Sequence, residues 1–294
     1  MYGTANPKGP KVDLTKPANF VGKKCLFVGG TSGIGQALAR AAAEGGCQTT
    51  VVGRAFKDDG LKNLTFQKAD LSSMKEAKKL ADQLPAGSYD YITFTNGIVP
   101  GNARVATAEG VELDMAASAL SRYVMLEAFG RRLKPTVRVF NWGFPGTAGL
   151  LKKTTLEDFN SEKSFKGGFE APHMNTVALN EALVLHYAAQ GREIYGMNPG
   201  LIRTGIRDSL HGGGFLGGLL ETVVDLFNPS AAKYAATVLP LYTATELSQN
   251  KGAMFSQAGR PILPSPEFAS SPALVAKWVA AADALSKQAL ASKE

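Results

Sequence analysis

The sequence predicts a single α/β domain with a doubly wound, mostly parallel sheet. Short apolar runs of four or five residues alternate with longer amphipathic stretches along a chain of 294 residues. Such runs suit strands buried on both faces, and the longer stretches suit the connecting helices. We find no internal repeat and no linker within residues 23–294, so one domain around one large core is expected.

The first half of this domain is expected to hold four strands and two helices. The strands are short apolar runs, whereas the helices place apolar residues at intervals of three and four. Glycines follow the second run at Gly53 and the fourth at Gly97. In chain order we expect strand 24–28, helix 36–44, strand 49–52, strand 64–67, helix 74–83 and strand 91–95.

The second half continues the alternation on either side of a polar, lysine-rich loop. Its sixth strand ends at Asn198-Pro199-Gly200, since proline and glycine interrupt strands. In chain order we expect helix 111–133, strand 137–141, helix 174–189, strand 193–197 and helix 273–290. This alternation implies a Rossmann-type arrangement, a parallel sheet with helices on both faces.

Composition and charge narrow the function classes. Residues 1–22 are rich in Lys, Pro, Gly and Asn and lack the apolar core of a signal peptide, so we expect a solvated tail. No apolar run reaches the roughly 18 residues of a membrane span. Cys25 and Cys47 show neither metal-ligand spacing nor a disulfide framework, which favours a reducing, cytoplasmic location and no metal. The net charge of +7 is scattered, so we expect no nucleic-acid partner.

A glycine-rich motif directly follows the first strand and opens the first helix. Residues 28–35 read Val-Gly-Gly-Thr-Ser-Gly-Ile-Gly. Glycines there let the backbone approach a pyrophosphate, and the helix N-terminus supplies free N–H donors and partial positive charge. A plain turn also collects glycines, but this strand–turn–helix context favours a dinucleotide cradle. The cradle is assigned to Gly29, Thr31, Ser32, Gly33, Ile34 and Gly35.

The spacing Gly29-x-x-x-Gly33-x-Gly35 resembles that of the short-chain dehydrogenase/reductase family, and the resemblance runs over about residues 23–205. Residues 156–165 look like an insert of its retinol-dehydrogenase-like branch. The resemblance implies a homodimer or homotetramer that assembles through the helices at 111–133 and 174–189.

The resemblance also implies further cofactor contacts beyond the glycine cradle. They are an acidic pair at the adenine, a glycine turn after the fourth strand, and a loop after the sixth strand at the carboxamide and the phosphates. Asn96 replaces the alanine of the family turn, so only Gly97 carries over there. These contacts fall on Asp70, Leu71, Gly97, Pro199, Gly200, Ile202 and Thr204.

Arg54 predicts which dinucleotide is bound. It ends the second strand, where an acidic residue would bind a ribose 2′-hydroxyl and repel a 2′-phosphate. A guanidinium suits a phosphate, and Lys57 is close by in the sequence. We therefore expect NADP(H) rather than NAD, with a solvated surface arginine as the alternative.

The catalytic positions of the family are substituted. The resemblance implies a Tyr and a Lys four residues apart, a Ser after the fifth strand, and an Asn on the long helix. Counting back without a gap from Pro199 places Phe169 at the tyrosine position and His173 at the lysine position, while Phe144 stands at the serine position. Ser118 stands at or near the asparagine position. Phenylalanine cannot donate a proton, and loss of a general acid costs on the order of 10²–10⁴ in rate.

Three residues are candidates for a substitute acid. His173 has a usable titration range for a proton shuttle, or it is a helix-start histidine hydrogen-bonded to cofactor or water. Glu170 is a second candidate, with a simple surface role as the alternative. Tyr123 either points into the cleft or packs against the sheet, and packing is favoured.

Aromatic side chains and a glycine-rich segment describe the expected substrate cleft. Phe144, Trp142 and Phe169 would make it dry and aromatic, which suits a flat apolar or cationic substrate, although core packing explains Trp142 equally well. Residues 209–226 are expected to form a mobile lid, with a membrane-touching helix as the alternative.

Three functions remain open on the sequence alone. The first is an NADP(H)-dependent oxidoreductase with an atypical site, acting on a small iminium ion, activated alkene or unusual carbonyl compound. The second is a non-redox isomerase or cyclase that reuses the cleft. The third is a catalytically silent protein that binds NADP(H).

Overall fold

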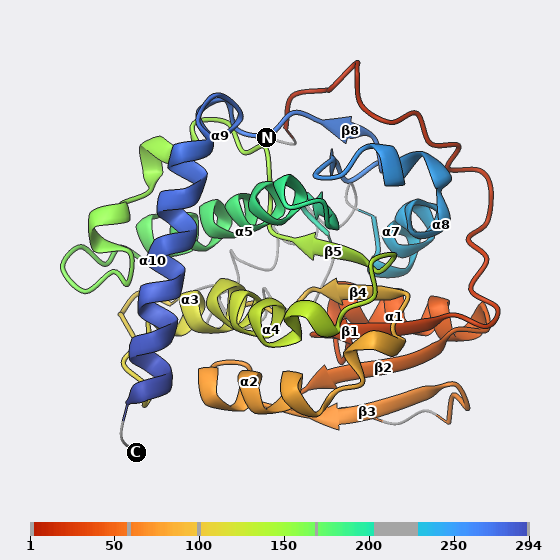
Figure 1. Cartoon of the computed structure of the whole chain (residues 1–294), viewed down its shortest axis with the longest axis horizontal. Helices are drawn as coiled ribbons and strands as arrows, with labels where there is room; N and C mark the ends of the chain where they lie inside the picture. Colours follow the sequence, from red (N-terminus) through yellow and green to blue (C-terminus); the bar gives the residue numbers. More distant parts are fainter. Residues whose placement is uncertain (1–2, 58–59, 99–100, 168–169, 203–228, 293–294) are drawn as a thin grey trace, which may run out of the picture.

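The computed structural model describes residues 3–57, 60–98, 101–167, 170–202 and 229–292 of the chain. Within them, eight strands form one sheet in the order β3-β2-β1-β4-β5-β6-β7-β8 (Figure 1). The strands are β1 (Lys24–Val28), β2 (Gln48–Gly53), β3 (Leu64–Lys68), β4 (Tyr91–Phe94), β5 (Arg138–Trp142), β6 (Glu193–Met197), β7 (Met254–Phe255) and β8 (Pro261–Ile262). All neighbours are parallel except β7 and β8, which are antiparallel. The predicted fold class is confirmed.

Helices cover both faces of the sheet, and β1 shows why. Leu26 and Val28 belong to one hydrophobic cluster, whereas Cys25 and Phe27 belong to another. Alternate residues of a strand point to opposite faces, so each face has its own core. One core contains α1 (Gly33–Glu44), α7 (Ala231–Val238) and α8 (Pro240–Thr243). The other contains α2 (Met74–Gln83), α4 (Ser121–Phe129), α5 (Ala171–Ala189), α9 (Pro266–Ser270) and α10 (Pro272–Ala291).

The predicted long helix over 111–133 is shorter and is not uniform. It consists of α3 (Leu113–Met115), a π-helical turn η2 (Ala116–Leu120) and α4. A π turn widens the helix and weakens the regular hydrogen-bond ladder, and such turns are frequent at functional sites. This one lies at the site described below.

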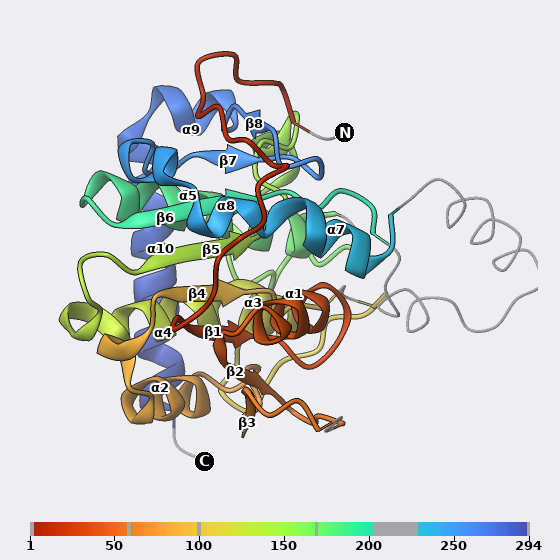
Figure 2. The same cartoon turned by 90° about the vertical axis from the view of Figure 1, so that its right-hand side faces the viewer.

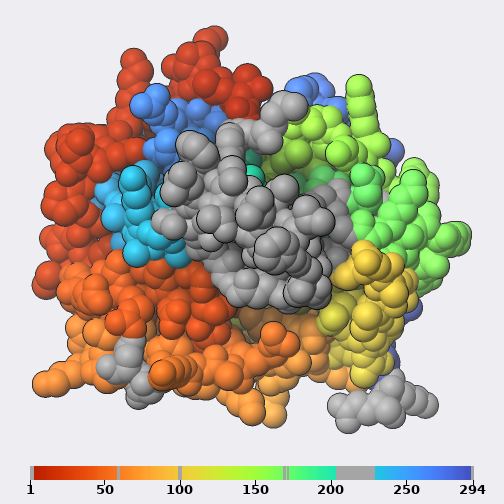
Figure 3. All heavy atoms as spheres, turned by 180° about the vertical axis from the view of Figure 1, so that it is seen from behind, coloured from red at the N-terminus to blue at the C-terminus, as the bar shows by residue number. Residues whose placement is uncertain are grey.

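Most residues of the N-terminal segment 3–22 are exposed, but the segment also contacts the domain at specific points. Asn6 N donates to Pro261 O (2.9 Å) and Leu263 N donates to Thr4 O (2.8 Å), so residues 3–6 extend the edge of the sheet at β8. Phe20 is 2% exposed and lies in the core of α1 and α7. Figure 2 shows the segment running along the molecule, and in Figure 3 it (red) lies beside C-terminal residues (blue).

The two cysteines are paired, contrary to the expectation from the sequence. Cys25 and Cys47 form a disulfide, with their Cα atoms 6.5 Å apart. Both are fully buried. Cys25 is on β1 and Cys47 directly precedes the neighbouring β2, a proximity that only the strand order reveals. The pairing removes the argument that placed the protein in a reducing compartment.

Helix α10 covers the helices that were expected to join two subunits. It packs along α5 and touches α2 and α4 (Figure 1). Trp278 of α10 is 1% exposed, and Tyr123 of α4 donates a hydrogen bond to Asp283 of α10 (3.1 Å). Residues 172–184 of α5 are all buried within one chain. Helix α10 therefore occupies the faces of α4 and α5 on which it packs, and the expected dimer through these helices stays a prediction.

Among the described residues, no helix is long and apolar enough to cross a membrane.

Candidate cofactor and catalytic site

The glycine turn after β1 is shaped by two close backbone approaches. Gly29 has a φ of +86°, and a Cβ there would lie 2.3 Å from the backbone nitrogen of Asn96. A Cβ on Gly35 would lie 2.3 Å from both Gly29 O and Thr95 Oγ1. The first glycine lets the turn pass the end of β4, and the last lets α1 pack on the turn. Gly35 therefore has a packing role first.

The N-terminus of α1 is open to an anion. Ser32 is the N-cap residue, yet its side chain makes no capping hydrogen bond, and the first turn contains no acidic residue. Ser32 is exposed, and Thr31, Gly33 and Ile34 are half-buried. The first N–H groups of a helix have no intrahelical partner and carry partial positive charge. This end of α1 can bind a diphosphate.

A cationic side chain starts beside this turn. Gly53 ends β2, and a Cβ there would lie 2.5 Å from Thr31 Oγ1, so the end of β2 is pressed against the turn. Arg54 follows directly and is exposed. Within the described part of the chain it has no hydrogen-bond or ion-pair partner. Its guanidinium is thus available to a ligand at the turn.

The residues expected to contact the adenine follow β3 at the same edge of the sheet. Asp70 is exposed, and its Oδ1 accepts hydrogen bonds from Ser72 N (3.0 Å) and Ser72 Oγ (2.8 Å). Leu71 is 6% exposed and packs in the core with α2. The acid is therefore held in place by its own turn, while the leucine anchors that turn.

The remaining expected cofactor residues follow β4 and β6. Gly97 is exposed, and a Cβ there would lie 3.1 Å from Ser118 Oγ. Pro199 and Gly200 are buried, and Gly200 N donates to Asn198 Oδ1 (3.1 Å). Ile202 is 4% exposed, in the core of α1 and α7. Thr204 lies outside the described residues.

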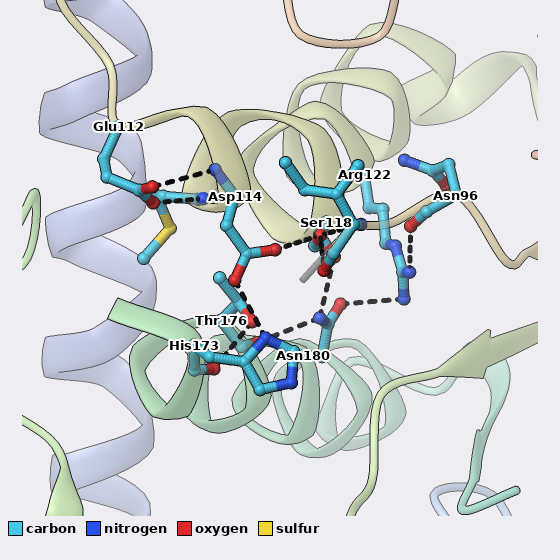
Figure 4. A network of polar contacts seen from close by, with 10 residues as sticks. Asn96, Glu112, Asp114, Ser118, Arg122, His173, Thr176 and Asn180 are labelled. Atoms are coloured by element: carbon cyan, nitrogen blue, oxygen red, sulfur yellow. Dashed lines mark hydrogen bonds and ion pairs between the residues drawn. The ribbon is translucent and has the colours of Figure 1, made fainter. Parts of the chain in front are cut away.

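Two asparagine side chains take up the carbonyl groups of the π turn. Asn96 Nδ2 donates to Ala117 O (2.6 Å). Asn180 Nδ2 donates to Ser118 O (2.9 Å; Figure 4). Asn96 follows β4 and Asn180 belongs to α5, so the widened turn is held from both sides. Asn96 Oδ1 is buried without a hydrogen-bond partner among the described residues.

Arg122 joins three elements at the carboxyl ends of the central strands. It is 3% exposed, and burial lowers its pKa, an effect that the nearby Asp114 partly offsets. Its guanidinium donates four hydrogen bonds, which compensate for part of the cost of burying the charge. The acceptors are Asn96 O after β4, Asn141 Oδ1 and Trp142 O on β5, and Asn180 Oδ1 on α5.

Asp114 connects two of the predicted catalytic positions. Its carboxylate is 0% exposed; Oδ1 accepts a hydrogen bond from Ser118 Oγ (2.5 Å), and Oδ2 lies 2.9 Å from His173 Nδ1 (Figure 4). Glu112 caps α3 by accepting from the backbone N–H groups of Asp114 (3.1 Å) and Met115 (2.8 Å). Burial raises the pKa of Glu112, and these hydrogen bonds oppose the shift.

The segment at 156–165 supports this site from outside. Asn160 Oδ1 accepts a hydrogen bond from Glu112 N (2.8 Å), and its Nδ2 donates to Gly110 O (2.9 Å). Asp158 accepts from the backbone N–H groups of residues 162–164 and closes the segment on itself. The start of α3, and hence Asp114, is fixed by this loop.

Comparison with known proteins identifies the fold and one oxidoreductase relative. No family model matches the chain. An uncharacterized oxidoreductase of Saccharomyces cerevisiae is 36% identical over 277 residues, which cover 90% of this chain and 88% of that protein. A solved short-chain dehydrogenase/reductase family protein has a TM-score of 0.56 at 21% identity, over 81% of this chain and 96% of its own. The chain is related to this yeast oxidoreductase and shares the fold of solved short-chain dehydrogenases/reductases.

Two further structures share the fold. An uncharacterized protein from Mycobacterium paratuberculosis has a TM-score of 0.60 at 16% identity, over 95% of this chain and 98% of its own. The angucycline C-6 ketoreductase LanV was solved with bound NADP. It has a TM-score of 0.57 at 16% identity, over 83% of this chain and 97% of its own.

The structure brings together only two of the four residues predicted at the catalytic positions. Ser118 and His173 meet at Asp114, as described above. Phe144 is half-buried with a φ of +53° and packs against the core. Phe169 and the proposed lid at 209–226 lie outside the described residues.

Trp142 and Tyr123 pack inside the protein, whereas Glu170 is exposed. The Trp142 indole donates to Tyr234 OH (3.0 Å) in the core, which agrees with the core-packing alternative for this residue. Burial raises the pKa of Tyr123 well above its ordinary value, and its hydroxyl faces α10, so the favoured packing role is confirmed. Glu170 is exposed at the start of α5.

Asp114, Arg122 and Asn180 were not found from the sequence. One signal was available, because Asp114, Ser118 and Arg122 recur every four residues within an otherwise apolar helix. That spacing places three polar side chains on one face, which a buried helix tolerates only when they are paired.

Proposed function

We propose that this protein is an NADP(H)-dependent oxidoreductase with an atypical catalytic site, acting on a small apolar or cationic organic compound. The observation that carries this proposal is the uncapped N-terminus of α1, beside which Arg54 begins, an arginine without a partner among the described residues. One structure of the same fold was solved with NADP, which agrees with the proposal.

The residues at the carboxyl edge of the sheet fit a dinucleotide. Gly29 and Gly35 stand where any larger side chain would collide with backbone, and the α1 N-terminus presents unpaired donors to a diphosphate. Asp70 is exposed at the adenine side, and the loop from Pro199 to Ile202 follows β6 at the opposite side. When bound, the cofactor would supply or accept a hydride at its nicotinamide ring.

Arg54 would select the phosphorylated cofactor. A charge-assisted hydrogen bond of a guanidinium to a phosphate contributes about 1.5–3 kcal/mol, which corresponds to tenfold or more in affinity. Its exposed side chain makes no competing ion pair among the described residues, so nothing in them offsets that gain.

The catalytic site would differ from the family pattern at four positions. Phe144 and Phe169 stand where the resemblance implies the serine and the tyrosine, and they cannot hold or protonate a substrate oxygen. His173 and Ser118 stand at the lysine and asparagine positions. Such a site suits an iminium ion, an activated alkene or an unusual carbonyl compound better than a simple ketone.

A binding and turnover experiment tests this proposal. NADPH binding is measured first by calorimetry, and its absorbance at 340 nm is then followed with a panel of ketones, iminium ions and enals. The proposal predicts NADPH binding and oxidation with at least one member of the panel. Absence of NADPH binding would refute it, while binding without oxidation would favour a silent NADP(H)-binding protein, or an isomerase or cyclase.

A further inference from the structure

We propose that His173 and Asp114 form a proton-transfer pair, in which His173 Nε2 exchanges the substrate proton and Asp114 positions the imidazole ring. This inference rests on the proposed oxidoreductase function and names the group that would replace the missing tyrosine. Three observations support it: the directions of the hydrogen bonds around Asp114, the burial of His173 and Asp114, and the position of this pair near the carboxyl ends of the central strands.

The hydrogen bonds around Ser118 fix the role of Asp114. Ile98 N lies 2.9 Å from Ser118 Oγ, and a backbone N–H can only donate, so the hydroxyl accepts there. The single hydroxyl hydrogen of Ser118 has two acceptors in reach, Asp114 Oδ1 at 2.5 Å and Ile98 O at 3.5 Å, and we assign it to the nearer one, Asp114. Asp114 therefore acts as an acceptor on this oxygen, as an ionised carboxylate does.

The second carboxylate oxygen then determines the tautomer of His173. Asp114 Oδ2 lies 2.9 Å from His173 Nδ1, so Nδ1 carries a hydrogen and donates it. A carboxylate that holds one ring nitrogen in this way orients an imidazole and stabilises its protonated form. The exchangeable proton is thereby assigned to Nε2, which lies on the far side of the ring from Asp114 (Figure 4).

Burial shields the hydrogen bond between Asp114 and His173 from water. The side chain of Asp114 is 0% exposed and that of His173 is 8% exposed. Arg122 is the nearby cation that offsets the buried carboxylate, and Glu112 lies on the far side of α3, bonded to the backbone. In such surroundings the tautomer is set by protein contacts rather than by water.

The position of the pair fits a catalytic role. Ser118 binds the backbone at Ile98, directly after Gly97 and the end of β4. Strands β1 and β4 are adjacent in the sheet, and the chain order reverses between them. In open α/β sheets, ligands bind at this switch point, at the carboxyl ends of the strands. His173 projects toward this region from the first turn of α5.

The pair narrows the substrate class to carbonyl compounds and activated alkenes. In carbonyl reduction, protonated His173 would give its Nε2 proton to the carbonyl oxygen, while the bound cofactor would supply the hydride for the new C–H bond. His173 would then be neutral, with its hydrogen on Nδ1, and would regain a proton from solvent. An iminium carbon needs the hydride alone, so a positioned acid would be without use there.

Nitrogen NMR of the histidines tests the assignment without any substrate. The chain has three histidines, His173, His186 and His211, and single Gln variants assign their signals. The neutral form of His173 is expected to carry its hydrogen on Nδ1, and added NADPH should shift the Nε2 signal of His173. A neutral His173 with its hydrogen on Nε2 in the unmodified protein, or no response to bound NADPH, would overturn the proposal.

Variants then test the catalytic step on a carbonyl substrate or enal from the panel. His173→Gln should lower kcat by about 10²-fold or more, with NADPH affinity within about threefold of the parent. Asp114→Ala should lose the Nδ1–H tautomer and lower kcat, and the double variant should be little worse than either. His186→Gln is the matched control, because His186 is on the same helix, is half-buried and is paired with Gln190 (2.8 Å).

The outcomes separate this inference from the function on which it rests. Unchanged kcat in His173→Gln would refute the pair and leave the oxidoreductase intact. Failure to bind NADPH would refute the proposed function, and the tautomer in the cofactor-free protein would still decide the hydrogen-bond assignment. If Asp114→Ala does not fold, nitrogen NMR of the unmodified protein still decides which nitrogen of neutral His173 carries the hydrogen.

Discussion

Replacing the buried Arg122 is expected to destabilise the protein strongly, because it ties together the ends of β4, β5 and α5. In Arg122→Met the side chain keeps much of its length and loses its four hydrogen bonds. Asn141 Nδ2 still donates to Asn180 Oδ1 (3.1 Å), so those two amides stay partly satisfied. Asn96 O and Trp142 O lose the guanidinium donor.

The magnitude follows from these two acceptors and the nearby acid. Each buried acceptor left unpaired costs about 1–3 kcal/mol. Asp114 also loses the cation that compensates its burial, while removing the desolvated guanidinium returns part of the loss. We expect the free energy of unfolding to fall by about 3–5 kcal/mol, the range for breaking one side of a buried charged network.

Arg132→Met is the matched control. Arg132 also donates four hydrogen bonds, but its side chain is 41% exposed, so water can replace the donors. Its acceptors are the backbone oxygens of Ala81, Asp82, Leu84 and Ala128. A loss below about 1 kcal/mol is expected. Urea denaturation followed by tryptophan fluorescence measures the free energy of unfolding of Arg122→Met and Arg132→Met. An equal loss of stability in the two variants would refute the reasoning.

Three further results are expected. Gly35→Ala should destabilise the fold by about 1–3 kcal/mol, since its Cβ would meet Gly29 O and Thr95 Oγ1, whereas Gly101→Ala, with open space around it, should change little in urea denaturation. Light scattering should find no dimer through α4 and α5, because α10 packs on both; a dimer that dissociates when the half-buried Leu185 and the exposed Ala189 of α5 are replaced by charged residues would contradict this. Burial raises the pKa of Glu181 above 4.5, so its stabilising contribution is complete below that value and falls as pH rises through the raised pKa. The stability difference between the parent and Glu181→Gln should therefore decrease from pH 4 to pH 8, and a constant difference would contradict the shift.

The central strands were predictable because each is a local pattern. The bounds of β1 and β6 agree with the predicted runs, since an uninterrupted apolar run determines a buried strand. Strands β7 and β8 have two residues each and are too short to show any period. They form because residues 3–6 and β6 supply partners that are distant in the sequence.

The site was predictable where its chemistry depends on backbone shape. Gly29 and Gly33 have positive φ values of +86° and +55°, which the glycine spacing indicates directly. Asp114 and Arg122 were missed because a buried charge is tolerated only through partners on other elements, and the sequence does not display those partners. The Cys25–Cys47 pairing was missed for the same reason.

Titration of the unmodified protein with NADPH and with NADH, by calorimetry, tests the central claim most directly. The account predicts that NADPH binds at least about tenfold more tightly, because a guanidinium–phosphate hydrogen bond contributes about 1.5–3 kcal/mol. Arg54→Ala should remove that preference and leave NADH affinity nearly unchanged, while Lys277→Ala, which removes an exposed charge on α10, should alter neither. Equal affinities of the unmodified protein for the two cofactors would contradict the account.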